Sequence, residues 1–237
     1  MKVKIIFNND TKNENLHTGW GGSFLVDGKI LFDTGENGAY LTENMDNLGV
    51  NLDEISAVVI SHDHWDHTGG LWQLLKNKEG LRVYACPNMS DEFKNKVKTL
   101  KGVLEEVNGI SEISKNIFLT GEIAGEYKGE YLAEQALIAK SDKGVSIITG
   151  CAHPGIIKMV DEVKNNFPQN DIYAVLGGFH LLHHSKELIE GIVEEFKLKG
   201  VKKAGPTHCS GHAAEEIFKV KYNGDFLTAR TGSEIEI

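Results

Sequence analysis

The segment His62–His67 constrains the fold of this chain more than any other feature, because it gathers three histidines and two aspartates within six residues. The residues before it, Ala57–Ile60, are apolar and largely β-branched, which predicts a short buried strand. The residues after it lead through two glycines into Leu71–Lys76, a stretch typical of a helix. The segment therefore lies on a strand-to-helix turn, where α/β sheets collect ligands and catalytic groups.

The spacing within this segment indicates a metal site. His62 and His64 are two residues apart, so in an extended segment both side chains point to the same side and can bind one ion. Asp66 and His67 are expected in the turn that follows, where they can face a second ion. A helical zinc motif needs its histidines four residues apart, and the strand-like residues before His62 argue against a helix there. The alternative is a solvated polar loop that happens to be rich in histidine.

Three more predicted strands lead to a histidine just past their last residues. These pairs are Val145–Thr149 with His153, Ile172–Leu176 with His180, and Lys203–Thr207 with His208. Glycines flank each histidine, as expected where the backbone turns sharply or approaches a ligand closely. If these three strands and Ala57–Ile60 are neighbours in a sheet, the histidines after all four strands converge at one edge. We expect His153 and His208 to be metal ligands and leave the role of His180 open.

At this point the chain resembles a known family. The segment His62–His67 fits the HxHxDH signature of the metallo-β-lactamase superfamily, and Ile30–Gly35 is similar to that superfamily's first motif, a strand that ends in an aspartate. The resemblance runs from about Trp20 to the carboxyl end. It implies an α/β fold, an αββα sandwich of the metallo-β-lactamase type, with a two-metal site at the edge of its paired sheets.

Departures from the usual pattern indicate one branch of this superfamily. No histidine occurs between His67 and His153, and Gly150–His153 takes the place of the usual Gly-Asp motif. Together with Leu132–Leu137, this pattern is similar to the 7,8-dihydropterin-6-methyl-4-(β-D-ribofuranosyl)aminobenzene 5′-phosphate synthases. The resemblance implies a metal-dependent hydrolase or related synthase that uses a metal-bound hydroxide on a small molecule, with a phosphorylated dihydropterin precursor as the candidate substrate.

The resemblance also implies a ligand set. It assigns His62, His64 and His153 to one metal ion and Asp66, His67 and His208 to the other, with a solvent hydroxide between them. Two zinc ions per chain are expected, with manganese or iron as alternatives. Such ions lower the pKa of bound water toward about 7.

The remaining assignments concern residues around the metals. Asp66 is expected to orient or deprotonate the nucleophile, and His180 to supply a missing ligand or protonate a leaving group. Asp33 is expected to hold a ligand imidazole, since metal-bound histidines usually need a carboxylate or carbonyl partner; the alternative is a turn-capping aspartate. Cys151 is either a soft ligand or a small packed thiol. Phe179 either offers a flat face to a pterin or packs in the core.

Composition fits a compact enzyme of one domain over residues 1–237. The net charge of −9 disfavours a nucleic-acid partner, so a small-molecule substrate is expected. No apolar run approaches the roughly 20 residues that span a membrane. The three cysteines form no CxxC pair, which fits a reducing cytoplasm. The oligomeric state stays open.

Two other functions compete with this interpretation: an iron-dependent redox enzyme on the same fold, and a non-catalytic metal-binding module. His183 and His184 are expected in a solvated loop, and His212 is expected at the surface or at the rim of the pocket. Apolar residues from Ile189 to Leu198 have the spacing of an outer helix, predicted over Ile189–Lys199.

Overall fold

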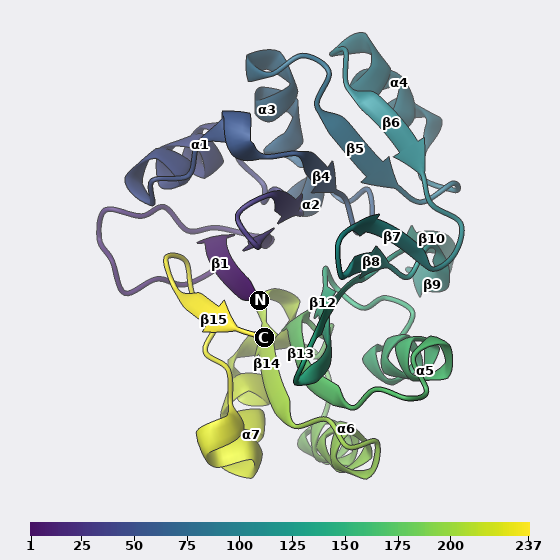
Figure 1. The fold of residues 1–237 in the computed structure, drawn as a ribbon. Helices are drawn as coiled ribbons and strands as arrows, with labels where there is room; N and C mark the ends of the chain where they lie inside the picture. Colours follow the sequence, from purple (N-terminus) through teal and green to yellow (C-terminus); the bar gives the residue numbers. More distant parts are fainter. The chain divides into compact units, whose positions relative to one another are not determined.

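The computed structural model describes residues 1–237, whose contacts divide into two compact units. The first unit comprises residues 1–108 and 230–236, and the second comprises residues 109–229 and 237. Each unit holds one large sheet and its own helices (Figure 1). The single domain over residues 1–237 stays a prediction.

The first unit is built on a seven-stranded sheet in the order β15-β1-β2-β3-β4-β5-β6. Its strands are β1 (Lys2–Phe7), β2 (Ser23–Val26), β3 (Ile30–Phe32), β4 (Ala57–Val59), β5 (Arg82–Ala85), β6 (Val103–Glu106) and β15 (Glu234–Glu236). Strands β3 to β6 pair in parallel, whereas β15, β1, β2 and β3 pair antiparallel. All three residues of β4 are buried, as expected for a parallel strand covered on both faces. The strand predicted before His62 is confirmed.

The helices of the first unit follow its parallel strands. They are α1 (Gly38–Asn47), α2 (Trp65–Thr68), α3 (Leu71–Asn77) and α4 (Asp91–Thr99), with a 3-10 turn, η1, at Leu52–Glu54. The helix predicted over Leu71–Lys76 is confirmed as α3. The turn expected to hold Asp66 and His67 is instead the single-turn helix α2, which begins directly after His64.

The second unit is built on a six-stranded sheet in the order β14-β13-β12-β11-β8-β7, beside a two-stranded hairpin, β9-β10. Its strands are β7 (Ser111–Ser114), β8 (Ile117–Leu119), β9 (Ile123–Tyr127), β10 (Glu130–Glu134), β11 (Leu137–Ser141), β12 (Gly144–Thr149), β13 (Ile172–Gly178) and β14 (Lys203–Thr207). Strands β12, β13 and β14 are parallel neighbours, so the turns that carry His153, His180 and His208 share one edge, as predicted. Strand β4, which carries the fourth histidine turn, belongs to the other sheet, so the expectation that all four strands are neighbours in one sheet is wrong.

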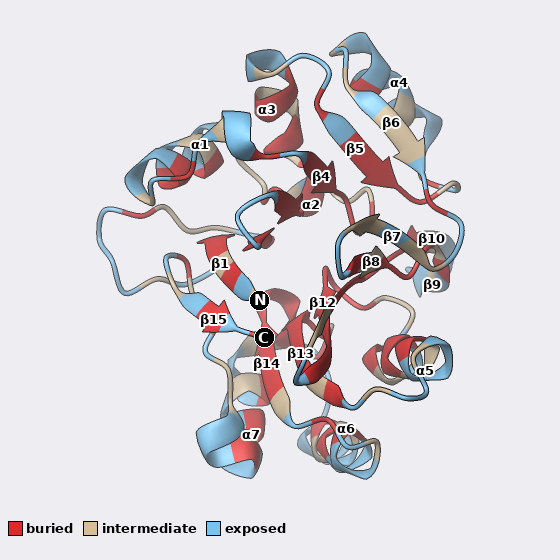
Figure 2. Ribbon diagram, viewed as in Figure 1, coloured by how far each residue is buried: buried red, intermediate tan, exposed pale blue.

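Three long helices pack on the second sheet and form its core. They are α5 (Ile156–Asn166), α6 (Lys186–Leu198) and α7 (Gly211–Tyr222), with short 3-10 turns η2 (His208–Ser210) and η3 (Asn223–Asp225). Apolar residues of all three helices join β12 and β13 in one buried cluster, coloured red in Figure 2. Helix α6 begins three residues before the predicted start, because the Ser185 side chain caps it by accepting from the Leu188 amide. The prediction that Leu198 packs inward is wrong, since that residue is 80% exposed.

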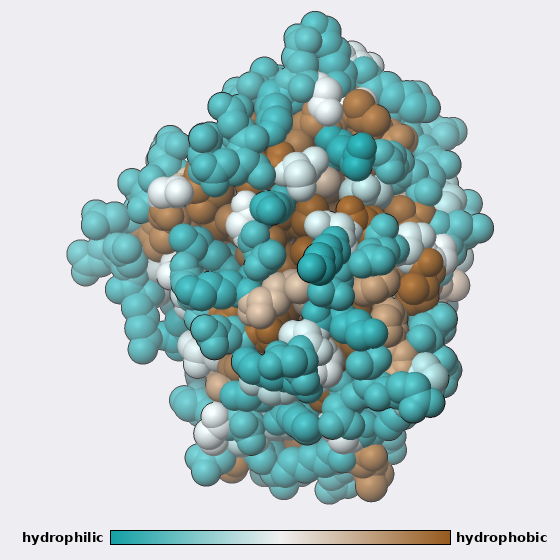
Figure 3. All heavy atoms as spheres, viewed as in Figure 1, coloured by the Kyte–Doolittle hydropathy of each residue, from teal (hydrophilic) through white to brown (hydrophobic).

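Charged residues make up a quarter of the chain, and hydrophilic side chains cover most of the face drawn in Figure 3. Helices of the length and apolar content needed to cross a bilayer do not occur in this structure.

Candidate metal centre

The segment His62–His67 is held against the loop that follows β3 by close backbone packing. His64 is in an extended conformation and precedes the first residue of α2. Gly69 and Gly70 follow α2, and a Cβ on them would lie only 2.0 Å from the Glu36 carbonyl oxygen and 2.3 Å from that of Thr34. A side chain at either position would push α2 away, so the glycines are required by this approach. Thr34 completes the junction, since its hydroxyl donates to the His67 carbonyl at 2.7 Å.

Asp33, directly after β3, organises the centre of this site. Its carboxylate is fully buried and has a hydrogen bond to Nδ1 of His67 at 2.7 Å. It also accepts from the backbone amide and the hydroxyl of Ser61, both at 2.7 Å. A carboxylate on Nδ1 leaves the Nε2 lone pair of His67 available, which is the usual support of a metal-binding histidine. The contact expected of Asp33 is present, and its backbone has a positive φ of 57°.

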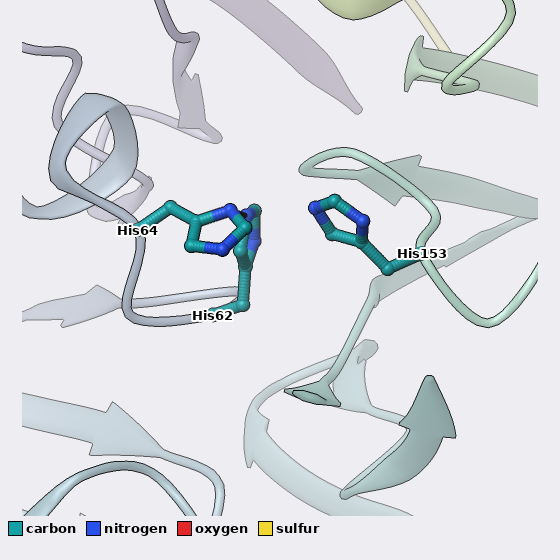
Figure 4. A group of neighbouring side chains, drawn as sticks. All are labelled: His62, His64 and His153. Atoms are coloured by element: carbon teal, nitrogen blue, oxygen red, sulfur yellow. Dashed lines mark hydrogen bonds between the residues drawn. The ribbon is translucent and has the colours of Figure 1, made fainter. Parts of the chain in front are cut away.

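The hydroxyl of Ser61 also determines the proton position on His62. Because its single proton is donated to Asp33, the Ser61 oxygen accepts from Nδ1–H of His62, 2.9 Å away. Nε2 of His62 then carries the lone pair. That atom lies 3.0 Å from Nδ1 of His64, and Figure 4 shows the two rings close together.

This donor set fits a divalent metal. Two nitrogens on one tetrahedral zinc, with bonds of about 2.0–2.1 Å, lie about 3.3 Å apart, close to the separation of His62 and His64. Nε2 of His67 lies 3.6 Å from a carboxylate oxygen of Asp66. The ring centroids of His67 and His62 are 4.2 Å apart. Imidazole nitrogen with carboxylate oxygen suits zinc, manganese or iron.

In the second unit, the turns after β12 and β13 bring His153 and His180 together. Their ring centroids are 4.4 Å apart, and the donor atoms of both lie within 4.8 Å of the Cys151 sulfur. His153, also drawn in Figure 4, comes from the loop between β12 and α5. The thiol of Cys151 therefore faces these imidazoles, which keeps its predicted role as a soft ligand open.

His208 lies on η2, after β14, beside another cysteine. Its donor nitrogen, the Cys209 sulfur and the Cys151 sulfur lie within 4.8 Å of one another. His180 and His208 both have positive φ, 56° and 53°, a strained conformation typical of functional turns.

Two titratable groups of this cluster affect each other. A hydrogen bond with Cys209 raises the pKa of His180, against the opposing effect of burial. Burial raises the pKa of the Cys209 thiol, but hydrogen bonds with Cys151 and His180, together with the nearby His208, outweigh it and hold that pKa well below its ordinary value. The shared hydrogen bond thus favours a charged pair of His180 and Cys209.

Other predicted residues lie elsewhere. Phe179 is 2% exposed and packs against Phe196 and Phe218, with ring centroids 5.6 and 5.7 Å away, so of its two predicted roles the structure shows core packing. The side chains of His183, His184 and His212 are exposed, as expected.

Three residues of the site were missed by the sequence interpretation. Ser61 could have been found as the hydroxyl residue between a buried strand and a histidine motif. Glu134 lies in the segment Leu132–Leu137, which the sequence analysis singled out without giving this residue a role, and the structure buries it fully. Tyr127 carried no local signal, and its ring lies 5.3 Å from that of His153 and 6.5 Å from that of His180.

Comparison with known proteins gives matches in sequence and in structure. A model of the metallo-beta-lactamase superfamily matches residues 23–103. The 7,8-dihydropterin-6-methyl-4-(beta-D-ribofuranosyl)-aminobenzene-5′-phosphate synthase of Methanocaldococcus jannaschii is 33% identical over an alignment of 263 positions, which covers 91% of this chain and 89% of the relative.

Solved structures match over the whole chain. The crystal structure of a metal-dependent hydrolase of the beta-lactamase superfamily aligns with a TM-score of 0.84 and 30% identity, covering 100% of this chain and 99% of that one. The short form of human tRNase Z aligns with a TM-score of 0.64 and 14% identity, covering 100% and 99% of the two chains, a likeness of fold alone.

Proposed function

Because the chain belongs to the metallo-β-lactamase superfamily, we propose that it is a metal-dependent enzyme acting on a small phosphorylated dihydropterin precursor, by hydrolysis or by a related synthase reaction. The observation that carries the proposal is the converging donor set after β4. Nε2 of His62 and Nδ1 of His64 face each other at 3.0 Å, and Nε2 of His67 lies 3.6 Å from the Asp66 carboxylate.

The hydrogen bonds behind these donors support metal binding over a merely polar loop. Ser61 holds Nδ1 of His62, and Asp33 holds Nδ1 of His67. Because Nδ1 of each ring is engaged, the Nε2 lone pair is the one that a metal ion can bind. A bound divalent metal would supply Lewis acidity toward a carbonyl or phosphoryl oxygen and lower the pKa of water. The half-buried Asp66 would hold or accept a proton of the attacking water or substrate group.

The substrate class rests on the relatives. The Methanocaldococcus jannaschii protein that shares 33% identity over 91% of this chain carries the name of a synthase for a phosphorylated dihydropterin compound. The 30% identical structural neighbour carries the name of a metal-dependent hydrolase. The first name gives a small-molecule product and the second gives a metal requirement, and together they define the two reactions to assay.

The roles of His153 and His208 as further ligands stay predictions, as does the count of two metal ions. The loop cysteine Cys151 offers an additional soft donor beside His153. A soft thiolate donor favours zinc or iron over magnesium or calcium.

Elemental analysis and an activity assay test the proposal. The purified protein should carry about two equivalents of zinc, manganese or iron. The metal-loaded protein should consume a phosphorylated dihydropterin precursor. Mass spectrometry would measure this consumption with and without a ribofuranosylaminobenzene phosphate as the second substrate.

Asp66→Asn should lower turnover by more than about a hundredfold while circular dichroism stays unchanged, in line with the loss of a catalytic acid or base. His184→Ala, at the exposed surface, serves as the matched control. A folded, metal-free Asp66→Asn protein with normal turnover would refute the mechanism.

A further inference from the structure

We infer that Glu134 is a positioning residue, whose buried carboxylate holds the loop that carries His153. Glu134 is the last residue of β10, in the β9-β10 hairpin, and it is 0% exposed. The inference rests on the proposed function, because the position of His153 affects the site only if that imidazole binds the metal or the substrate.

Three hydrogen bonds of this carboxylate are directed at one loop. Oε1 accepts from the backbone amides of Cys151 at 2.9 Å and Ala152 at 2.8 Å, and Oε2 accepts from the amide of His153 at 2.7 Å. Three consecutive amides that point at one anion form a concave binding site for that anion, of the kind that protein backbones also use for phosphate. A carboxylate side chain of the chain itself occupies this position.

The loop needs such a partner because it departs from regular structure. Strand β12 ends at Thr149 and α5 begins at Ile156, so these amides lie outside the regular hydrogen bonding of both elements and need acceptors elsewhere. Ala152 also has a positive φ of 60°, which is unfavourable for a residue with a Cβ. Charge-assisted hydrogen bonds are about twice as strong as neutral ones, which explains a carboxylate here despite the cost of burying its charge.

The rest of the hairpin contacts the same loop. A Cβ on Gly125 of β9 would lie 2.9 Å from the Pro154 nitrogen and 3.1 Å from the His153 carbonyl carbon, so the hairpin backbone packs directly against the loop. The Tyr127 ring meets the His153 ring edge to face, at 5.3 Å and 73°. The hairpin therefore contacts the amide, the carbonyl carbon and the ring of His153, and the direction of this imidazole depends on β9-β10 as well as on β12.

Cobalt binding tests the inference with a spectroscopic readout. Cobalt(II) replaces the native metal, and its visible absorption bands report the ligands and their geometry. Glu134→Gln keeps the size of the side chain but places an amide NH₂ against at least one backbone N–H. We expect cobalt binding about 10- to 100-fold weaker, as for other residues that support metal ligands, with a visible spectrum shifted toward that of His153→Ala. Glu130→Gln removes the same charge from an exposed position of the same strand and should change neither.

The alternative is that Glu134 only stabilises the fold. In that case Glu134→Gln lowers the melting temperature but leaves cobalt affinity and spectrum at wild-type values, which would overturn the inference. Wild-type cobalt binding in His153→Ala would also overturn it, whereas the proposed function would still be judged separately by the metal content and turnover of Asp66→Asn.

Amide hydrogen exchange keeps the inference testable if Glu134→Gln does not fold. In the wild-type holoenzyme, the amides of Cys151, Ala152 and His153 should exchange far more slowly than those of the exposed turn at Lys128 and Gly129. Exchange of all three at the rate of that turn would show that the carboxylate does not hold the loop.

Discussion

Replacing Asp33 by asparagine tests the organisation of the first unit's site. The carboxylate accepts from three donors, the amide of Ser61 at Oδ1 and the hydroxyl of Ser61 and Nδ1–H of His67 at Oδ2, all at 2.7 Å. An asparagine keeps one acceptor oxygen and replaces the other by an NH₂ group. At least one of the three buried donors then faces another donor.

The magnitude follows from these contacts. With the NH₂ group at the Oδ1 position, the Ser61 amide loses its acceptor, at a cost of about 1–3 kcal/mol. The two bonds that remain change from charge-assisted to neutral, which weakens each by about half. We therefore expect Asp33→Asn to lower the free energy of unfolding by about 2–5 kcal/mol. Because Nδ1 of His67 is no longer held by an anion, metal affinity should fall by about 10- to 100-fold.

Guanidinium unfolding of the metal-free protein measures the first quantity, and chelator competition on the metal-loaded protein measures the second. Asp63→Asn is the matched control, since its half-buried carboxylate accepts from the exposed backbone amide of Ser90 at 2.8 Å, and both quantities should change little. If Asp33→Asn loses stability but binds metal like the wild type, Asp33 is a turn-capping residue and our interpretation of its contact with His67 is wrong.

Three further predictions concern the second unit. His153→Ala should lower metal content per chain more than His184→Ala, since the latter is exposed; equal loss would mean that the strand ends carry no ligand. Phe179→Ala should lower the free energy of unfolding by about 3–5 kcal/mol, because it leaves a cavity in the core, whereas a substrate-facing ring would change binding without this loss. Burial, and then the nearby charge of Asp225, raise the pKa of Tyr222 in the folded state. The unfolded phenol ionises near pH 10, so folding stability should fall as the pH rises above about 10, and Tyr222→Phe should flatten this dependence in urea titrations; an unchanged slope would contradict the assignment.

Much of the local structure could be predicted from short-range patterns. The β-branched run before His62 and the apolar spacing over Leu71–Lys76 depend on neighbouring residues and backbone geometry alone, so strand β4 and helix α3 follow from them. The α/β fold of the metallo-β-lactamase type is likewise confirmed. It could be predicted because the HxHxDH signature requires one strand-turn-helix geometry. The start of α6 was missed by three residues, since Ser185 extends the helix through a cap that apolar spacing does not report.

The partners of the site residues were decided by the tertiary structure. Asp33 meets His67 across 34 residues, and Glu134 meets His153 across 19, because sheet order and strand register bring these segments together. The same holds for Phe179, whose burial depends on α6 and α7 covering its ring. The sequence by itself determined which donors exist and on which turns they lie, through spacing along the backbone. Only the tertiary structure decided which proton His67 keeps and which loop Glu134 holds, because those choices depend on contacts between segments far apart in the chain.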